Sequence, residues 1–417
     1  MKKHRNYFYI ILLLASVIFV SACVQQRPAA ADANNGLAIN EFTADPTVAE
    51  PIDFVNFFLD VENVGGTTAT CVRAQLFNVD SWLDPRTGTS ISSLGSLVFS
   101  NVQLTPSGLQ GQYCIGSTCY STFDYTRPAG VSFTVFFDQV ATQISKEFLC
   151  KRDFLVTDPA LDAVTEFREE LLPPDPARNR AGEVFTASWT LLPPTLPEGI
   201  QSDFRPTTRV SYIYKTTGQV KIPVFTRAEW RRRQDLGQSI DVAVIDNTNA
   251  PIKIAASRPL NPIIVNTDPD AITINPTERA TFVLELQNVG DGFPTPAEFF
   301  DGKQGGFIFG TVILRGAGAS FHDCLGVGPG AQQLGLIGIV GDQGEIVIGP
   351  HNKELLRMRS DNRAPFGCTI ALERATWQAR PFGTVELVFN LFYVYFIDGA
   401  VTVKVLGEES GTPGVFR

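Results

Sequence analysis

Cysteine is the residue type whose number and spacing most clearly suggest chemistry in this sequence, since seven cysteines accompany only three histidines. Cys23 stands alone near the amino terminus, directly after the small residues Ser21 and Ala22. The other six form an even set, which in an oxidising compartment indicates disulfide bonds. They are Cys71, Cys114, Cys119, Cys150, Cys324 and Cys368.

The amino terminus has the pattern of a secretory signal peptide. Lys2, Lys3 and Arg5 precede an uncharged, largely apolar run that ends at Ala22. This run is shorter than the ~20 apolar residues that span a bilayer comfortably. Residues 20–23, Val-Ser-Ala-Cys, resemble the lipobox of lipoproteins, in which the signal is cut before the cysteine and the new terminal residue carries lipid.

The resemblance implies a signal peptide over residues 1–22, lipidation of Cys23 and a flexible tether over residues 23–36. Two acyl chains suffice for stable membrane attachment. An uncleaved membrane anchor that happens to contain a cysteine is the alternative. In both cases positive residues stay inside, so we expect the remainder of the chain outside the cytoplasm and anchored to the cell membrane.

An exported chain suits disulfides, and we favour Cys71 with Cys150, Cys114 with Cys119, and Cys324 with Cys368. Four of these cysteines lie in the first half of the chain and two in the second, so only the pairing within the first half is open. Cys114 and Cys119 could instead bind metal. Structural zinc needs four Cys or His ligands in close pairs, however, and no second pair accompanies them. We expect neither metal nor cofactor.

Apolar and polar residues alternate along many segments, which predicts strands. The strands recur as an internal repeat, with landmarks in the same order in both copies. The matched pairs are residues 59–65 with 284–290, both ending in Asn-Val-Gly, Trp189 with Trp377, and residues 212–218 with 393–399, both beginning with Tyr-x-Tyr. The first copy is longer, and its extra residues are expected in surface loops, which carry function more often than shared strands.

Each landmark has a structural interpretation. Gly65 and Gly290 are expected to take a positive φ where a strand ends. Tyr-x-Tyr places both rings on one face of a strand, and a turn near Thr217–Gly218 or Asp398–Gly399 predicts a β-hairpin. The matched tryptophans are expected to pack between two sheets.

Residues 40–46, Asn-Glu-Phe-Thr-Ala-Asp-Pro, followed by an alternating strand and Glu-Asn-Val-Gly-Gly at 62–66, resemble the opening of the CARDB domain, and residues 263–290 are similar. That family has an immunoglobulin-like sandwich and occurs in prokaryotic surface proteins associated with adhesion. The resemblance implies an all-β fold with two tandem immunoglobulin-like domains. Their bounds would be 37–225, as one enlarged sandwich or two small ones, and 239–407, before a tail over 408–417.

A helix is predicted between the copies, over residues 226–238. Thr226 and Glu229 fit a capping box, Gly237 can end the helix, and Trp230 and Leu236 could dock it. Its arginines, Arg227, Arg231, Arg232 and Arg233, form the dense basic cluster of the mature chain. A solvated linker helix is one interpretation, and contact with anionic lipid or a surface polymer is the other.

Motifs for catalysis are lacking in the sequence. His322 and His351 are the histidines beyond the signal, and neither lies in a catalytic motif; neighbouring residues in His322-Asp323-Cys324 would point to opposite faces of a strand. The formal net charge of −9 argues against nucleic acid as a partner.

Two uses of carboxylates stay open. Glu169 and Glu170 could serve glycoside hydrolysis, which needs only two carboxyl groups at a suitable separation. Asp268 and Asp270 could bind calcium with the Asn266 amide, although an interdomain turn explains them as well.

Taken together, these features predict a membrane-anchored cell-surface protein with a structural, adhesive or protein-interaction role and no catalysis. Its expected partners are the membrane, through the lipid anchor, and a protein or surface polymer outside the cytoplasm. The alternative is a carbohydrate- or solute-binding surface lipoprotein that uses the insertion loops of the first copy.

Overall fold

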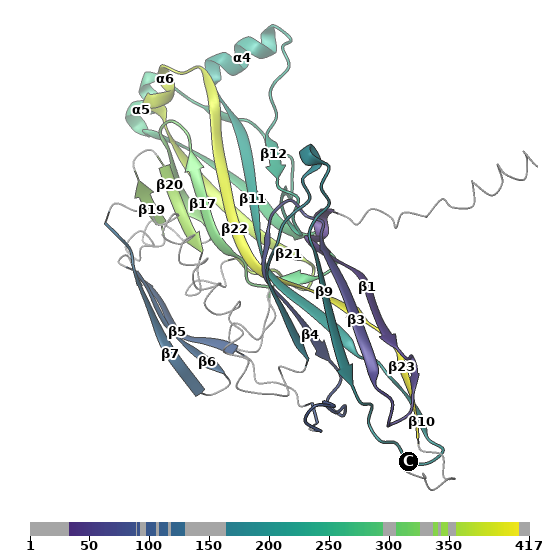
Figure 1. The fold of residues 1–417 in the computed structure, drawn as a ribbon. Helices are drawn as coiled ribbons and strands as arrows, with labels where there is room; N and C mark the ends of the chain where they lie inside the picture. Colours follow the sequence, from purple (N-terminus) through teal and green to yellow (C-terminus); the bar gives the residue numbers. More distant parts are fainter. Residues whose placement is uncertain are drawn as a thin grey trace, which may run out of the picture. The chain divides into compact units, whose positions relative to one another are not determined.

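The computed structural model describes residues 33–88, 90–91, 97–105, 108–115, 118–129, 164–294, 306–325, 337–340, 343–348 and 356–407. Most of these residues lie in β-strands arranged in several sheets, so the predicted all-β class is confirmed (Figure 1). Residues Ala33–Arg417 form one compact unit. The predicted signal and the tail over 408–417 lie outside the described residues.

Each copy of the repeat contributes one outer sheet. The first has the order β1-β3-β9, formed by β1 (Leu37–Asp45), β3 (Val55–Asn63) and β9 (Val184–Leu191). The second has the order β13-β15-β21-β18, formed by β13 (Ile252–Ala256), β15 (Thr277–Asn288), β21 (Arg363–Glu373) and β18 (Ala319–Cys324). Buried and exposed residues alternate along β9, as expected for strands with one face on the core.

A ten-stranded sheet joins the two copies. Its main path has the order β19-β20-β17-β22-β11-β4-β8, and β12, β14 and β16 pair with its central strands. The strands are β4 (Ala69–Phe77), β8 (Thr165–Leu171), β11 (Thr207–Thr226), β12 (Val244–Asn247), β14 (Ile263–Val265), β16 (Phe293–Pro294), β17 (Phe309–Arg315), β19 (Ile337–Val340), β20 (Gln343–Ile348) and β22 (Phe382–Ala400). Because this sheet is continuous, the copies do not separate at the linker helix; the domain bounds 37–225 and 239–407 stay predictions.

Two short sheets complete the described strands. β23 (Val403–Leu406) lies between β10 (Gln201–Phe204) and β2 (Val48–Ala49), so the end of the second copy pairs with strands of the first. β5 (Leu97–Thr105), β6 (Gly108–Ile115) and β7 (Thr118–Thr126) form a separate three-stranded sheet within the additional length of the first copy.

The central strands β11 and β22 pair antiparallel from Thr207 opposite Ala400 to Phe225 opposite Phe382. In this register Ile213 lies opposite Val394, its own equivalent in the repeat. A local two-fold axis therefore passes between these two residues and relates the copies.

Four buried tyrosines surround this axis: Tyr212, Tyr214, Tyr393 and Tyr395. The Tyr212 hydroxyl accepts a hydrogen bond from the Leu37 amide (3.1 Å), and the Tyr393 hydroxyl accepts one from the Ile252 amide (3.3 Å). Leu37 and Ile252 begin β1 and β13, the equivalent strands of the two copies. Burial raises the pKa of each of these tyrosines, so the hydroxyls stay protonated.

The Asn-Val-Gly landmarks also have the same structure in both copies. Asn63 Oδ1 accepts from the Gly65 amide (3.1 Å), and Asn288 Oδ1 accepts from the Gly290 amide (3.3 Å). Neither glycine is among the residues with positive φ, so that expectation was wrong. Glycine is required instead because a Cβ at Gly65 would overlap the Tyr214 hydroxyl, and one at Gly290 would lie 2.7 Å from the Tyr395 hydroxyl.

The predicted hairpins were wrong. β11 runs straight through Thr217–Gly218, and β22 runs through Asp398–Gly399. The physical reason is that β22 pairs along nearly all of β11 on one side, while β4, β12 and β14 pair with successive parts of it on the other. Pairing with distant strands thus holds these segments in an extended conformation, although their local sequence favours a turn.

The tryptophan landmarks are not equivalent. Trp189 lies in β9, opposite Phe57 of β3, whereas Trp377 lies in the short helix α6 (Arg374–Gln378). Both side chains are buried, and Trp377 packs against Gly383. The match of Trp189 with Trp377 in the sequence therefore does not reflect a shared position in the fold.

The predicted linker helix is present as α4 (Arg227–Asp235). Thr226 Oγ1 accepts from the Glu229 amide (3.3 Å), which is one half of the predicted capping box. The reciprocal half is absent, because the Thr226 amide donates to the Pro381 carbonyl instead. Trp230 packs on Phe225, but Leu236 is 60% exposed and does not dock the helix.

Candidate binding groove and predicted site residues

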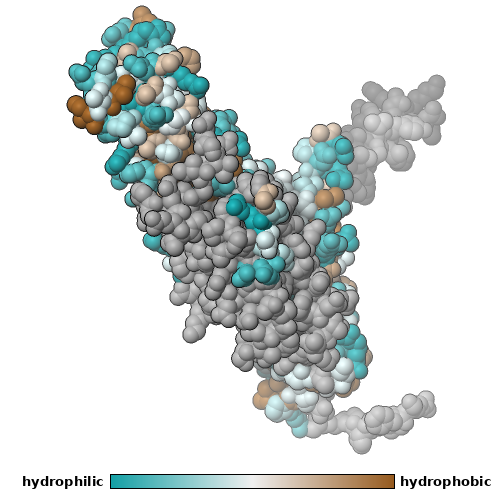
Figure 2. All heavy atoms as spheres, turned by 90° about the vertical axis from the view of Figure 1, so that its left-hand side faces the viewer, coloured by the Kyte–Doolittle hydropathy of each residue, from teal (hydrophilic) through white to brown (hydrophobic). Residues whose placement is uncertain are grey.

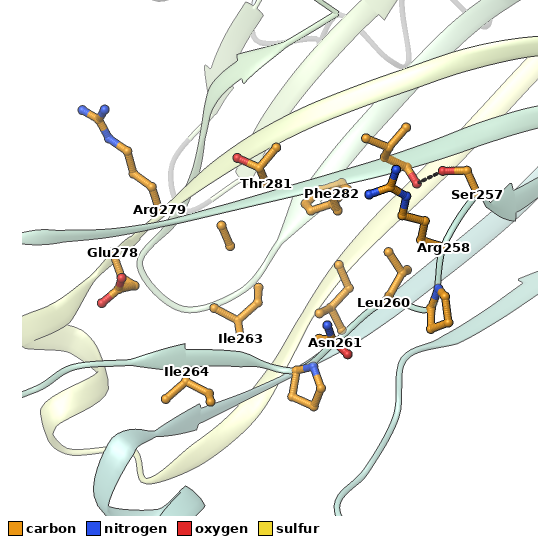
Figure 3. A pocket seen from close by; sticks show the side chains of 15 residues that line it. Ser257, Arg258, Leu260, Asn261, Ile263, Ile264, Glu278, Arg279, Thr281 and Phe282 are labelled. Atoms are coloured by element: carbon orange, nitrogen blue, oxygen red, sulfur yellow. Dashed lines mark hydrogen bonds between the residues drawn. The ribbon is translucent and has the colours of Figure 1, made fainter.

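A groove of about 700 Å³ lies along one edge of β15 (Figure 3). Ile222 of β11, residues 257–264 and residues 278–283 line it. It follows from unequal strand lengths: β13 pairs only with Leu284–Asn288, while β15 continues to Thr277. Beyond Ala256 the chain leaves the edge through Pro259 and Pro262, which cannot donate backbone hydrogen bonds to a ladder.

The chain then enters the other sheet, where β14 pairs parallel with the end of β11. Within the described residues, no strand covers residues 277–283 of β15 on this side, although β21 pairs with them on the other. The groove therefore separates an open strand edge from the segment that crosses between the two sheets.

The backbone polar groups of alternate β15 residues are directed at the groove. The Val289 amide donates to the Pro251 carbonyl on the β13 side (2.8 Å), while the Asn288 amide donates to the Asn362 carbonyl on the β21 side (2.9 Å). Alternation along the strand directs the N–H and C=O groups of Arg279 and Thr281 into the groove. The Ser257 hydroxyl confirms this by donating to the Val283 carbonyl (3.1 Å).

The inner side of the groove is apolar. Phe282 and Ile263 are both buried and lie on opposite sides of it in Figure 3. Leu260 and Ile222 continue this surface between the two sheets.

The rim of the groove carries charge. Arg258 and Arg279 are exposed. The acidic Glu278 is already engaged, because its carboxylate accepts from Arg374 Nη2 (3.0 Å) and from the Asn266 amide (3.2 Å). The charge offered to a ligand by these rim residues is therefore positive.

The predicted arginine cluster is divided by Glu229. Arg232 and Arg233 donate to its carboxylate at 2.7 to 2.9 Å, and these hydrogen bonds lower the pKa of Glu229 to about 2. Arg233 also lies over the Phe225 ring, 4.8 Å from its centre. Arg227 and Arg231 remain exposed on α4.

The helices α5 (Pro269–Ile274) and α6 are linked by a hydrogen bond from the Arg374 amide to the Pro276 carbonyl. The described surface at this end of the molecule is mostly hydrophilic, with small hydrophobic groups (Figure 2). Because Glu229 pairs with Arg232 and Arg233, the arginine cluster is partly neutralised, and its contact with lipid or polymer stays a prediction.

The cysteine predictions have different outcomes. Cys324 and Cys368 face each other on β18 and β21 and form the predicted disulfide. Cys71 is also disulfide-bonded, while Cys150, its predicted partner, lies outside the described residues. The backbone register places Cys114 opposite Cys119, on β6 and β7. Cys23 lies outside the described residues.

The residues considered for chemistry are not assembled into a site. Cys324 is no free nucleophile beside His322, because its sulfur is bonded to Cys368. His351 lies outside the described residues. Among the residues that the structure describes, no cluster of His, Cys, Asp or Glu could hold a metal ion, and Asp268 serves as N-cap of α5. Glu169 and Glu170 are exposed on β8.

The groove was not among the features predicted from the sequence. The sequence contained two signals for it. Pro259 and Pro262 follow β13 and end it early, whereas the alternating pattern of its partner strand β15 extends to Thr277. Residues 130–163, in the part of the first copy that carries its extra length, lie outside the described residues.

No protein-family model matches this chain, and no curated protein does either. In the described part of the chain, none of the helices has the length and apolar character needed to cross a membrane. The fold and the groove geometry therefore carry the functional argument.

Proposed function

We propose that this chain is a lipid-anchored cell-surface protein with a structural, adhesive or protein-interaction role, built from two immunoglobulin-like sandwiches that share a sheet. The observation that carries the proposal is the Cys324–Cys368 disulfide. Disulfides persist in oxidising compartments outside the cytoplasm. This is the setting that the lipobox-like residues 20–23 imply.

The sandwich arrangement is supported by the equivalence of the sheets. β1, β3 and β9 of the first copy have their counterparts in β13, β15 and β21 of the second, as the repeat and the shared Asn-Val-Gly geometry indicate. The continuous pair β11–β22 makes the two copies one body. Such a body is suited to presenting the surfaces of both copies at a fixed orientation relative to each other.

Membrane fractionation of cells that express the wild type and Cys23→Ser tests the anchor. The wild type is expected in the membrane fraction, and Cys23→Ser is expected to leave it. Ser21→Thr, a small change that keeps Cys23, is the matched control. Membrane attachment that is unchanged in Cys23→Ser would overturn lipidation.

Solute binding is a second candidate, and the groove beside β15 favours it. Its volume of about 700 Å³ lies in the range of small-molecule sites, and it combines apolar walls with a few polar groups. A thermal-shift screen of sugars and small solutes tests this function. A ligand whose effect is lost when Ala280 is enlarged to Phe would place it in the groove.

A further inference from the structure

We propose that the open edge of β15 binds an extended peptide segment of a partner protein, which adds as a strand and carries apolar residues alternating with acidic ones. This inference rests on the proposed protein-interaction function and names its site. The occupant follows from three properties of the groove: its backbone edge, its apolar side and its charge.

The backbone edge favours a strand as occupant. The N–H and C=O groups of Arg279 and Thr281 are directed into the groove, and within the described chain no strand pairs with them there. An added strand would continue the ladder that β13 begins at Leu284–Asn288. Main-chain hydrogen bonds of this kind give affinity in strand addition, and pockets for alternate side chains give specificity.

The far wall of the groove determines how bulky the occupant can be. Residues 260–264 close it opposite β15 (Figure 3). The edge of another folded sheet would bring its own covering layers against this wall, whereas a single extended segment needs only the space beside β15. The wall therefore favours a peptide over a second copy of this chain.

Side-chain chemistry follows from the two faces of β15. Residues of the added strand that point inward would meet Phe282 and Ile263, which are buried and apolar. Residues that point outward would lie on the face that carries the exposed Arg279, beside Arg258. Because Glu278 is already paired with Arg374, the accessible charge favours acidic residues at outward positions.

The test uses the full chain in detergent and a labelled acetylated and amidated peptide in which Val and Glu alternate. We expect saturable binding by fluorescence anisotropy. Binding should weaken by about tenfold or more for three probes: a peptide with Lys in place of Glu, a block-ordered peptide of the same composition, and one methylated on alternate backbone nitrogens.

A charge-reversed variant connects binding to this groove. Arg258→Glu with Arg279→Glu should weaken the Glu peptide about tenfold and strengthen the Lys peptide. The matched control is Arg180→Glu with Arg205→Glu, two exposed arginines of the first copy, which should change neither. Circular dichroism and thermal unfolding confirm that both variants are folded.

Hydrogen exchange gives a readout specific to strand addition. The amides of Arg279 and Thr281 should exchange more slowly when the Val-Glu peptide is bound, because they become donors in the ladder. Absence of binding, binding that survives backbone methylation, or self-association of the chain through this edge would each overturn the proposal. Loss of the lipid anchor in the fractionation experiment would leave it intact, so the two failures are distinguishable.

Discussion

The two copies of the repeat differ most clearly at the edge of their outer sheets. In the first copy β1 pairs with β3 along its length, from Leu37 opposite Asn63 to Asp45 opposite Asn56. In the second, β13 covers only the last part of β15, and residues 277–283 stay open. The central strand of the outer sheet is thus covered along its length in the first copy and is partly open in the second.

The core and the edge of this fold obey different constraints. Near the two-fold axis, the Tyr212 and Tyr393 hydroxyls accept equivalent backbone hydrogen bonds, and the two Asn-Val-Gly turns share the hydrogen bond from the Gly amide to the Asn side chain. The edge, where water can satisfy unpaired backbone groups, is free to differ. A difference at such a position is where the copies can take separate roles.

Hydrogen exchange of the free protein should show the largest contrast. The paired amides of β3 should exchange at least ~100-fold more slowly than the groove-facing amides of Arg279 and Thr281, because a protected amide must first open its hydrogen bond. Mass spectrometry of peptides covering residues 55–63 and 277–283 measures this. Equal protection of the two segments would break the comparison.

Removing the disulfide of the second copy should have the next largest effect. Cys324→Ala with Cys368→Ala opens a link across a sequence separation of 44 residues. The loss of free energy of unfolding should be about 3–4 kcal/mol, on the chain-entropy account. Urea unfolding without reducing agent measures it. Val283→Ala, an exposed change in the same sheet, serves as control, and an unchanged free energy in the double variant would contradict a bracing role.

The tyrosines test whether the copies are energetically equivalent. Tyr212→Phe leaves the buried Leu37 amide without its acceptor, and Tyr393→Phe does the same to the Ile252 amide. Each should lower the free energy of unfolding by about 1–3 kcal/mol, the cost of an unsatisfied buried group. Urea unfolding of both variants compares them. If the losses of free energy of unfolding differed widely between the two variants, the copies would be equivalent in geometry but not in energy.

Local patterns in the sequence were sufficient for the features that local chemistry determines. Alternation predicts the strands, the repeat predicts equivalent roles for Asn63 and Asn288, and Thr226 predicts the start of α4. Features set by distant partners were not predictable in this way. The uninterrupted β11 depends on β22, which lies far along the chain.

The groove belongs to the second kind. It exists because β13 ends at Ala256 while β15, held by β21, continues to Thr277. Neither strand alone carries that information. Trp377 shows a different kind of error. It was matched with Trp189 from the sequence, but Trp377 lies in the helix α6, whereas Trp189 lies in the strand β9.

The smallest expected effect on stability concerns the carboxyl ends of the two long strands, β11 and β22. β11 of the first copy is followed by α4, whereas β22 of the second leads through a short connection to β23. Glu229 links Arg232 and Arg233 within α4, and its pKa is lowered from 4.5 to about 2. A lowered pKa in the folded state means that the carboxylate stabilises the fold above pH 4.5, and that this contribution is lost as the pH falls through about 2.

Glu229→Gln should therefore be less stable than the wild type at pH 7, and the difference should shrink as the pH falls below 4.5. Urea unfolding of both proteins at pH 7 and pH 3 measures the change. Glu198→Gln, at an exposed carboxyl in the first copy, is the control and should show no such trend. If the stability difference between Glu229→Gln and wild type were constant with pH, the arginine pair would not stabilise α4. The helix, and with it the end of β11, would then depend on capping by Thr226 and packing of Trp230.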